Sequence, residues 1–167
     1  MVAASRLSAA DVWELLEQVK DPEVPVLSVV ELGIIRDVRV DDAGTTVVIT
    51  PTYSGCPAMR VIEDDIRGAL GTHGVESLKI ETVFSPAWTT DWMSDDAKAK
   101  LRKYGIAPPG KADRTEGLVT ITRRAPIACP ICGSTRTTVK SEFGSTACKS
   151  INYCEDCRQP FEAFKAI

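Results

Sequence analysis

The 167-residue sequence predicts an α+β protein in two parts: a small αββαβα domain with a three-stranded sheet, then a C-terminal β module clamped by cysteines. Three observations lead to this prediction. Helical and strand-like apolar patterns follow one another up to about residue 107. Five of the six cysteines lie beyond residue 128. The charge balance changes sign, since residues 1–110 carry 11 basic and 17 acidic side chains, whereas residues 111–167 carry 9 and 6.

The first helix is predicted over residues 9–20. Ser8 is typical of an N-cap, and Asp11, three residues later, completes a capping box. Pro22 ends the helix, because proline removes a donor and clashes with the preceding turn. Two strands are expected next, on either side of a turn at residues 41–44.

A second helix is predicted from Pro57 to Leu70, with apolar residues on one face and Gly71 at its end. Residues 75–84 alternate between apolar and charged side chains and predict a strand. A third helix follows, capped by Ser94, with acidic residues in its first turn and basic residues after them.

The domain boundary is predicted in a segment rich in proline, glycine and charge. We expect an assembly-factor-like α+β domain at 1–107, a linker at 108–124 and a four-cysteine domain at 125–167. The last domain has some forty residues, which is below the size that usually folds on apolar burial alone. It therefore needs an additional stabilising crosslink.

Two C-x-x-C pairs can provide that crosslink by binding a metal ion. Cys129 and Cys132 form the first pair, Cys154 and Cys157 the second, and 21 residues separate the pairs. Each pair can grip one metal from one tight turn, which is the spacing of a zinc ribbon. We therefore expect structural zinc, with rubredoxin-like iron as the alternative. Cys148 is either a buried small residue, an alternative ligand or part of an iron–sulfur site.

The remaining cysteine, Cys56, lies in the stretch "PTYSGCPAM". It is predicted at the N-cap of the second helix, with Pro57 at the first helical position. The positive end of a helix lowers the pKa of a thiol, so this turn suits a reactive or metal-accepting sulfur. The alternative is an inert cysteine packed under the turn.

Other chemistry is sparse. His73 is the only histidine, and no catalytic triad, P-loop or G-x-G-x-x-G motif is present. Trp88 and Trp92 either fold a loop onto the core or offer a surface to a protein partner. The basic balance of the C-terminal part is too weak for nucleic-acid binding. No apolar run could cross a membrane and no secretory signal is seen, so a cytoplasmic protein with reduced thiols is expected.

Several stretches in order resemble the PaaD family, also called PaaJ, whose members are small components of the phenylacetyl-CoA ring-epoxidase system of bacterial phenylacetate degradation. They are "DPEVPVLSVVELGIIRDV", "TPTYSGCPAM", "PAWTTDWMS", "GIAPP" and the cysteine-rich tail. The N-terminal part also resembles the SufT-like iron–sulfur assembly factors. The matching residues are Asp21-Pro22-Glu23, Glu31-Leu32-Gly33, Thr52 and Cys56-Pro57.

The resemblance implies a non-catalytic accessory or maturation factor. Cys56 would contact iron or an iron–sulfur cluster in transit, with Asp21, Glu23, Glu31 and Thr52 as neighbours. The implied partners are the oxygenase and reductase components of the epoxidase and the iron–sulfur assembly machinery. A structural subunit that only organises the epoxidase complex is the alternative, and a homodimer stays open. An independent thiol enzyme would need a base beside Cys56 that the sequence does not show.

Overall fold

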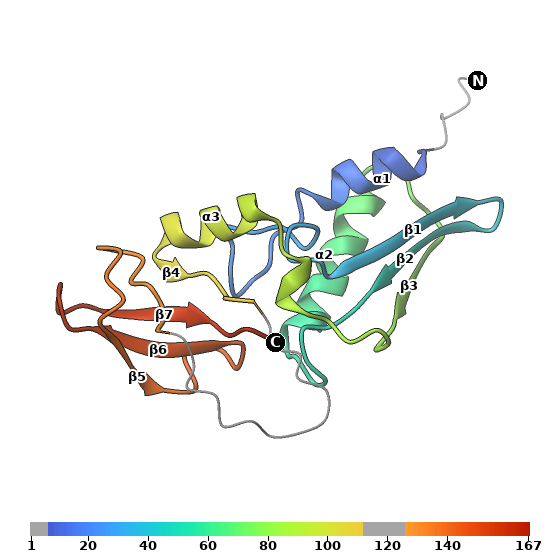
Figure 1. The fold of residues 1–167 in the computed structure, drawn as a ribbon. Coiled ribbons are helices and arrows are strands. Elements are labelled where there is room, and N and C mark those ends of the chain that lie inside the picture. Colours follow the sequence, from blue (N-terminus) through green and yellow to red (C-terminus); the bar gives the residue numbers. More distant parts are fainter. Residues whose placement is uncertain (1–6, 112–125) are drawn as a thin grey trace. The chain divides into compact units, whose positions relative to one another are not determined.

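The computed structural model describes residues 7–111 and 126–167, which divide into two compact units, Met1–Trp88 and Thr89–Ile167 (Figure 1). The division falls well before the boundary predicted at residue 107. Residues 89–107 belong to the second unit, because residues 106–107 pair with its last strand and Thr90 hydrogen-bonds Ile167. Most of the predicted linker, residues 108–124, lies outside the described residues.

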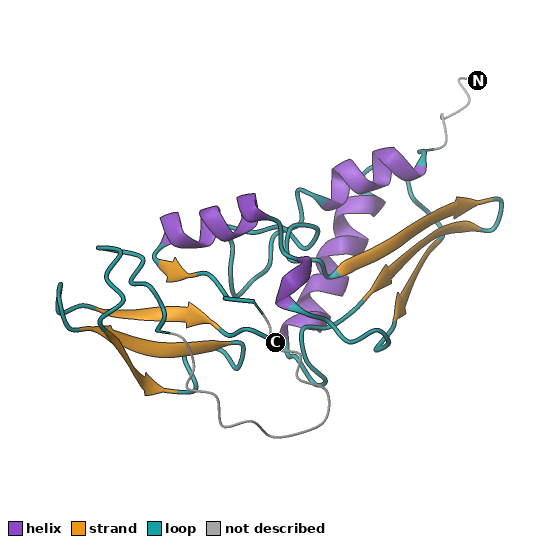
Figure 2. Cartoon of the chain, in the orientation of Figure 1, coloured by secondary structure: helices purple, strands orange, loops and turns teal. Residues whose placement is uncertain are grey.

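The first unit contains two helices and a three-stranded sheet (Figure 2). Its elements are α1 (Ala9–Leu16), β1 (Ile35–Asp41), β2 (Gly44–Ile49), α2 (Ala58–Gly71) and β3 (Leu78–Thr82). The sheet has the order β1-β2-β3, with β1 antiparallel to β2 and β3 parallel to it. A parallel neighbour needs a crossover, which α2 provides. The predicted order of helices and strands is confirmed.

Helix α1 begins as predicted and ends early. The Ser8 hydroxyl accepts the Asp11 N–H at 3.2 Å and the Asp11 carboxylate accepts the Ser8 N–H at 2.7 Å, which confirms the capping box. The helix ends at Leu16 rather than residue 20. The Val19 N–H donates to the Leu16 carbonyl at 3.1 Å, and the Val19 carbonyl accepts the Val29 N–H at 3.0 Å. Pairing with a distant segment thus replaces the last helical turn.

The core of the first unit lies on one face of the sheet. Helix α1 packs against α2 and β1, and the central strand β2 is largely buried. On the opposite face, Arg39 of β1 reaches Glu81 of β3 at 2.6 Å, so charged side chains meet solvent. The largest fully buried side chains of this unit are Leu16, Leu27, Leu32, Ile34, Ile49, Ile62, Ile66 and Leu70.

The second unit is a four-stranded sheet with one short α-helix before it. Its elements are η1 (Thr90–Trp92), α3 (Asp95–Tyr104), β4 (Ile106–Ala107), β5 (Thr137–Ser141), β6 (Lys149–Cys154) and β7 (Pro160–Phe164). The strand order is β4-β7-β6-β5, in which β4 runs parallel to β7 and the other pairs are antiparallel. Ser94 caps α3 as predicted.

The second unit buries fewer large aliphatic side chains than the first, although Met93, Leu101, Ile106 and Phe164 are among its buried residues. One cluster of buried residues unites Ala107, Cys129, Cys154, Phe161 and Ala163. Two of these five residues belong to the C-x-x-C pairs, so the core cannot be separated from the cysteine cluster. None of the helices in the described part of the chain is long and apolar enough to span a membrane.

Candidate metal centre and the Cys56 turn

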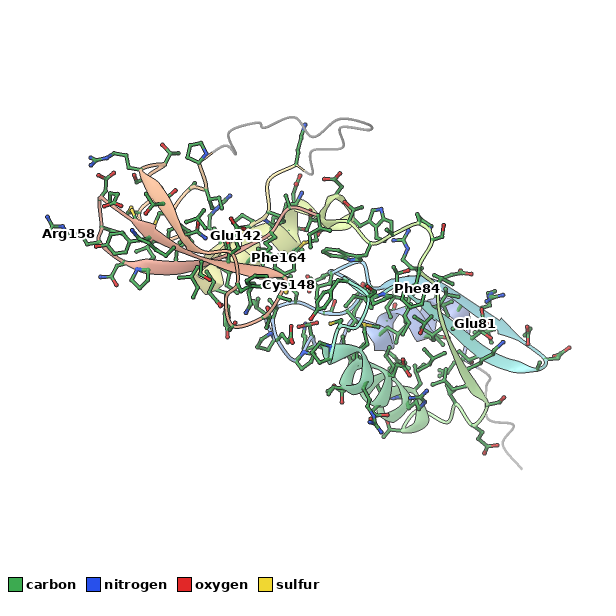
Figure 3. All side chains as sticks on the ribbon, turned by 90° about the horizontal axis from the view of Figure 1, so that it is seen from below. Glu81, Phe84, Glu142, Cys148, Arg158 and Phe164 are labelled. Carbon is green, nitrogen blue, oxygen red and sulfur yellow. The ribbon has the colours of Figure 1, made fainter. Side chains whose placement is uncertain are left out.

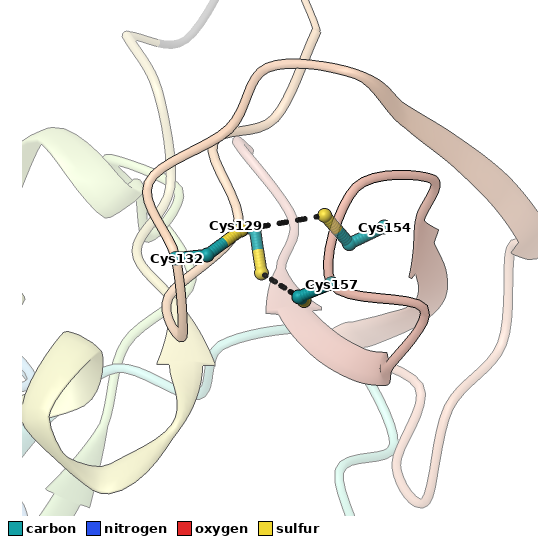
Figure 4. A group of neighbouring side chains, drawn as sticks. All are labelled: Cys129, Cys132, Cys154 and Cys157. Carbon is teal, nitrogen blue, oxygen red and sulfur yellow. Dashed lines mark hydrogen bonds between the residues drawn. The ribbon is translucent and has the colours of Figure 1, made fainter.

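The two C-x-x-C pairs come together at one end of the ribbon formed by β5, β6 and β7 (Figure 4). The four Sγ atoms lie within 4.8 Å of one another and none is in a disulfide. Cys129 and Cys157 Sγ are 3.7 Å apart, and Cys132 and Cys154 Sγ are 3.5 Å apart. A tetrahedron with Zn–S bonds of about 2.3 Å has sulfur–sulfur edges of about 3.8 Å. The donor set and its spacing therefore fit zinc.

The two turns that carry the cysteines have the same construction. The Cys129 N–H donates to the Ser134 carbonyl at 2.9 Å, and the Cys154 N–H donates to the Gln159 carbonyl at 3.0 Å. The residue after the second cysteine is left-handed in both turns, with φ +77° at Gly133 and +55° at Arg158. Both turns therefore aim two sulfurs at one point.

Main-chain donors and burial act on the thiols in opposite directions. The N–H groups of Cys157 and Asp156 lower the pKa of Cys154 to about 7. Burial, together with the neighbouring Cys154 sulfur, raises the pKa of Cys157 to about 12. Four thiols this close cannot all ionise unless a cation offsets the mutual repulsion of the thiolates. A divalent ion supplies that charge.

The cluster has the character of a structural site. Cys129 and Cys154 are buried, and four thiolates complete a tetrahedron with no position left for a substrate. Across residues 7–111 and 126–167, no other set of three or more metal-ligating side chains comes together. Zinc bound there would hold the two turns together, with Cys129, Cys132, Cys154 and Cys157 as its ligands.

One bridge between the two turns was not foreseen from the sequence. Ser134 and Arg136 follow the first turn, and both bind Asp156 of the second, with Arg136 Nη1 2.8 Å from Asp156 Oδ1. Side-chain contacts of this kind between two turns have no fixed sequence separation, so no sequence pattern predicts them.

Cys148 does not belong to the metal cluster. It precedes the first residue of β6, whereas Cys154 ends that strand, and six extended residues span about 20 Å. Figure 3 shows Cys148 and Arg158, which follows the second turn, well separated along the sheet. Cys148 is buried and its Sγ lies 3.0 Å from the Thr146 hydroxyl. The prediction of an alternative ligand is therefore corrected in favour of a buried small residue.

Cys56 lies in the turn that joins β2 to α2, and its side chain is partly exposed. Pro57, not Cys56, occupies the N-cap position, so the predicted cap is shifted by one residue. The Cys56 N–H donates to the Tyr53 carbonyl at 3.2 Å, and Gly55 before it has φ +88°. The turn thus leaves Cys56 partly exposed and next to the start of α2.

The Cys56 turn follows a polar group without a partner. Thr50 comes directly after β2, is 1% exposed and has a hydroxyl with no hydrogen-bond partner among the described residues. Buried hydroxyls are normally paired, so this one marks a local cost in stability.

The acidic residues expected beside Cys56 have structural contacts of their own. The buried Asp21 carboxylate accepts the N–H groups of Glu23 and Val24, each at 2.8 Å. The Glu31 carboxylate accepts the Ser28 N–H at 3.0 Å, and the Ser28 hydroxyl accepts the Glu31 N–H at 3.0 Å. These bonds shape two turns. Together with Cys56, these carboxylates form no set of three metal-ligating groups in the described chain.

Thr52 lies in the connection between β2 and α2, within four residues of Cys56, and its side chain is partly exposed. It is therefore near Cys56 in the chain.

The two predicted partner-binding tryptophans differ. Trp88 is 4% exposed and its Nε1 donates to the Leu32 carbonyl at 2.9 Å, so it anchors its loop to the core and does not offer a partner surface. Trp92 is half-buried at the end of η1. His73 is exposed, and its Nδ1 lies 2.9 Å from the Ala69 carbonyl at the end of α2.

Comparison with known families supports both parts of this description. Residues 9–83 match the family described as iron–sulfur cluster assembly protein, and residues 114–165 match the family described as PaaD zinc beta ribbon domain. The two matches leave out residues 84–113, which contain both the predicted boundary and the observed division at 88/89.

One relative matches nearly the whole chain, whereas others match only about half of it. An Escherichia coli K12 protein, provisionally named as one of the subunits of 1,2-phenylacetyl-CoA epoxidase, is 45% identical over 94% of this chain and 92% of its own length. The Fe-S protein maturation auxiliary factor SufT of Staphylococcus aureus is 39% identical over 48% of this chain and 93% of its own. A solved domain of unknown function, DUF59, from Bacillus anthracis superposes with TM-score 0.53 and 31% identity, covering 56% of this chain and 90% of that one.

Proposed function

We propose, because this chain belongs to the PaaD family of 1,2-phenylacetyl-CoA epoxidase components, that it is a maturation factor for the epoxidase. It would assist assembly of an iron–sulfur cluster or iron centre in the reductase or oxygenase component, without catalysing the ring epoxidation itself. Only one histidine is present in the chain, which leaves it without the carboxylate–histidine set of a di-iron oxygenase.

One observation carries the proposal. The domain that matches the iron–sulfur cluster assembly family has a free, partly exposed cysteine, Cys56, at the start of a helix. The other cysteines are either grouped in the four-cysteine cluster or, in the case of Cys148, buried. Iron or a cluster is the cargo, and Cys56 is the thiol that would contact it. A thiolate is the ligand that iron–sulfur clusters use.

The test compares Cys56→Ala with Cys148→Ala, the matched control at a buried cysteine outside the metal cluster. Each variant is co-expressed with the epoxidase components, and the iron and acid-labile sulfide of the purified components are measured per polypeptide. We expect Cys56→Ala to lower both contents severalfold and Cys148→Ala to leave them near the wild-type level. Full iron and sulfide content with Cys56→Ala would refute the thiol role.

A structural role in the complex is the second candidate, favoured by the name of the Escherichia coli relative, which designates that protein a subunit. It predicts that the chain purifies in a fixed ratio with the oxygenase and reductase components. It also predicts that Cys56→Ala changes neither that ratio nor the metal content of the components. The same co-expression experiment therefore separates the two candidates.

A further inference from the structure

We propose that two copies of this chain associate through the free edge of β3, with β3 of one copy antiparallel to β3 of the other. The inference goes beyond the proposed function and does not depend on it. It assigns an interaction surface to the first unit and identifies its partner as a second copy of the same chain. The combined sheet has the strand order β1-β2-β3-β3-β2-β1 about a twofold axis.

Strand β3 differs from the other edge strands of the described chain. A register shift between Ile35 and Asp37 interrupts β1, and another between Val139 and Ser141 interrupts β5. Strand β4 has only two residues. Bulges and short strands protect sheet edges from the addition of a further strand. Strand β3 has five residues in unbroken register with β2, and no strand among residues 7–111 and 126–167 pairs with its other edge (Figure 1).

The pairing with β2 determines which main-chain groups of β3 are free. The Ser77 carbonyl accepts an N–H of β2 at 2.9 Å, and the Val83 N–H donates to a carbonyl of β2 at 2.9 Å. Along a strand with a parallel neighbour, successive residues direct these groups alternately toward that neighbour and away from it. The N–H and carbonyl groups of Leu78, Ile80 and Thr82 therefore point away from β2.

These free groups match those of a second copy. In an antiparallel pair centred on Ile80, that residue faces the partner's Ile80, and Leu78 faces the partner's Thr82. Residues that face each other in this way exchange two hydrogen bonds, and such pairs recur at every second residue. The outward main-chain groups of all three residues are thus satisfied in one register.

The same register brings opposite charges together. Lys79 faces the partner's Glu81, and Glu81 faces the partner's Lys79, in the kind of pair whose side chains approach most closely. Lysine in an edge strand normally discourages pairing, but here it meets a carboxylate. A centre moved by one residue would set two lysines or two glutamates opposite each other, which is destabilising. Charge therefore selects the register that the hydrogen bonds also favour.

The charged residues are on the sheet face that meets solvent. Within one copy, Lys79 Nζ lies 2.7 Å from Glu81 Oε1, and Arg39 Nη2 lies 2.6 Å from Glu81 Oε2. The Lys79 side chain is 71% exposed, so it can also reach a second carboxylate. Pairing of two copies joins these groups into one network of alternating charge across the twofold axis.

On the other face, the pairing covers apolar side chains that one copy leaves partly exposed. Ile80 lies beside the fully buried Val47 of β2 in the parallel register, yet Ile80 and Leu78 are only half-buried. Burial on this face thus falls from β2 to β3. The partner's Ile80 would extend the apolar layer across the axis and remove this surface from water.

The size of the contact sets its strength. Five residues of paired strand span about 17 Å, and such a contact buries less area than a standard protein interface. We therefore expect a dimer with a dissociation constant in the micromolar range.

The arrangement keeps the two Cys56 turns apart. Each turn follows the C-terminal end of β2, which runs parallel to β3. Because the two copies of β3 run in opposite directions, the turns are at opposite ends of the combined sheet. The dimer therefore carries two separate thiols and no thiol site shared between the copies.

The first experiment measures the mass of the zinc-loaded full chain by sedimentation equilibrium over a range of concentrations. Lys79→Glu and Glu81→Lys each place like charges opposite each other in a dimer of identical chains. When the two variants are mixed, every carboxylate of one strand faces an ammonium group of the other. The matched control is Asp64→Lys, because Asp64 is exposed on α2 and its replacement changes the charge by the same amount as Glu81→Lys.

We expect each single variant to weaken self-association about tenfold, and the equimolar mixture to regain nearly the wild-type strength. Asp64→Lys should change it less than about twofold. A wild-type chain that stays monomeric at millimolar concentration, single variants that associate like wild type, or a mixture no stronger than its parts would each overturn the proposal.

A second pair of variants tests the hydrogen bonds apart from the charges. Thr82→Pro removes an outward N–H that makes no bond to β2, whereas Thr82→Val keeps it. Proline is accepted in an edge strand at such a position, and Thr82 is exposed, so both variants should fold. Thr82→Pro should weaken the dimer severalfold and Thr82→Val should not. Equal association of the two would contradict the proposed pairing.

These outcomes are separable from those of the proposed function. If the chain is monomeric while Cys56→Ala lowers the iron and sulfide contents of the epoxidase components, the dimer is refuted and the maturation role stands. If the charge variants behave as expected while Cys56→Ala leaves those contents unchanged, the dimer stands and the thiol role is refuted.

Discussion

The two units of this chain are stabilised by different means. The first buries eight large aliphatic side chains from both helices, the sheet and the intervening loops. The second has a core cluster of five buried residues, two of which are metal-ligating cysteines. We expect apolar burial alone to hold the first unit and the ribbon of the second unit to depend on its metal. The difference shows how a family can attach a small module to a domain without giving it a large core.

Removing the metal should have the largest effect, because it should unfold the ribbon of the second unit and leave the first unit folded. A chelator that strips zinc from the chain, or Cys154→Ala, should unfold the ribbon, because structural zinc contributes on the order of 10 kcal/mol in small modules. Amide spectra by NMR should lose the dispersed signals of residues 126–167 and keep those of residues 9–83.

Zinc added back to the chelated protein is the control and should restore the lost signals. Persistence of a folded ribbon without metal would show that its apolar core suffices and would remove the contrast between the units.

A core truncation in the first unit should have the next largest effect. Leu70 of α2 is fully buried. Leu70→Ala should lower the free energy of unfolding of this unit by about 2–5 kcal/mol, through lost burial and the cavity left behind. Hydrogen exchange of α2 and β2 amides measures the loss.

Zinc content in the same samples should stay at one ion per chain, because the ligands all belong to the other unit. A cost below about 0.5 kcal/mol would mean that α2 does not rely on apolar packing, contrary to the range for buried leucines.

The smallest effect should distinguish the two cysteine turns from each other. Gly133 and Arg158 occupy the same left-handed position, at φ +77° and +55°. Only glycine adopts that conformation without steric cost. Arg158→Gly should therefore stabilise zinc-bound protein by about 0.5–1 kcal/mol, and Gly133→Ala should destabilise it by about 1 kcal/mol.

Thermal unfolding of the zinc-loaded proteins measures both changes, with opposite shifts in Tm. Shifts of the same sign would contradict the equivalence of the two turns.

Local chemistry explains which features could be predicted from the sequence. The capping box at Ser8 and Asp11 acts within one helical turn, so its residues suffice to identify it. A C-x-x-C pair acts within one tight turn, and its spacing already indicates a metal ligand. The resemblance in chain order then placed the protein in its family, which the comparisons bear out.

Tertiary structure decided what depends on distant partners. Burial of Trp88 requires the Leu32 carbonyl, and the separation of Cys148 from the metal requires the length of β6. The division at residue 88 follows from pairing between residues 106–107 and β7. Hydrogen bonds between residues a few positions apart depend on the local sequence alone. Strand pairing and burial depend on segments that are far apart in the sequence and meet only in the folded protein.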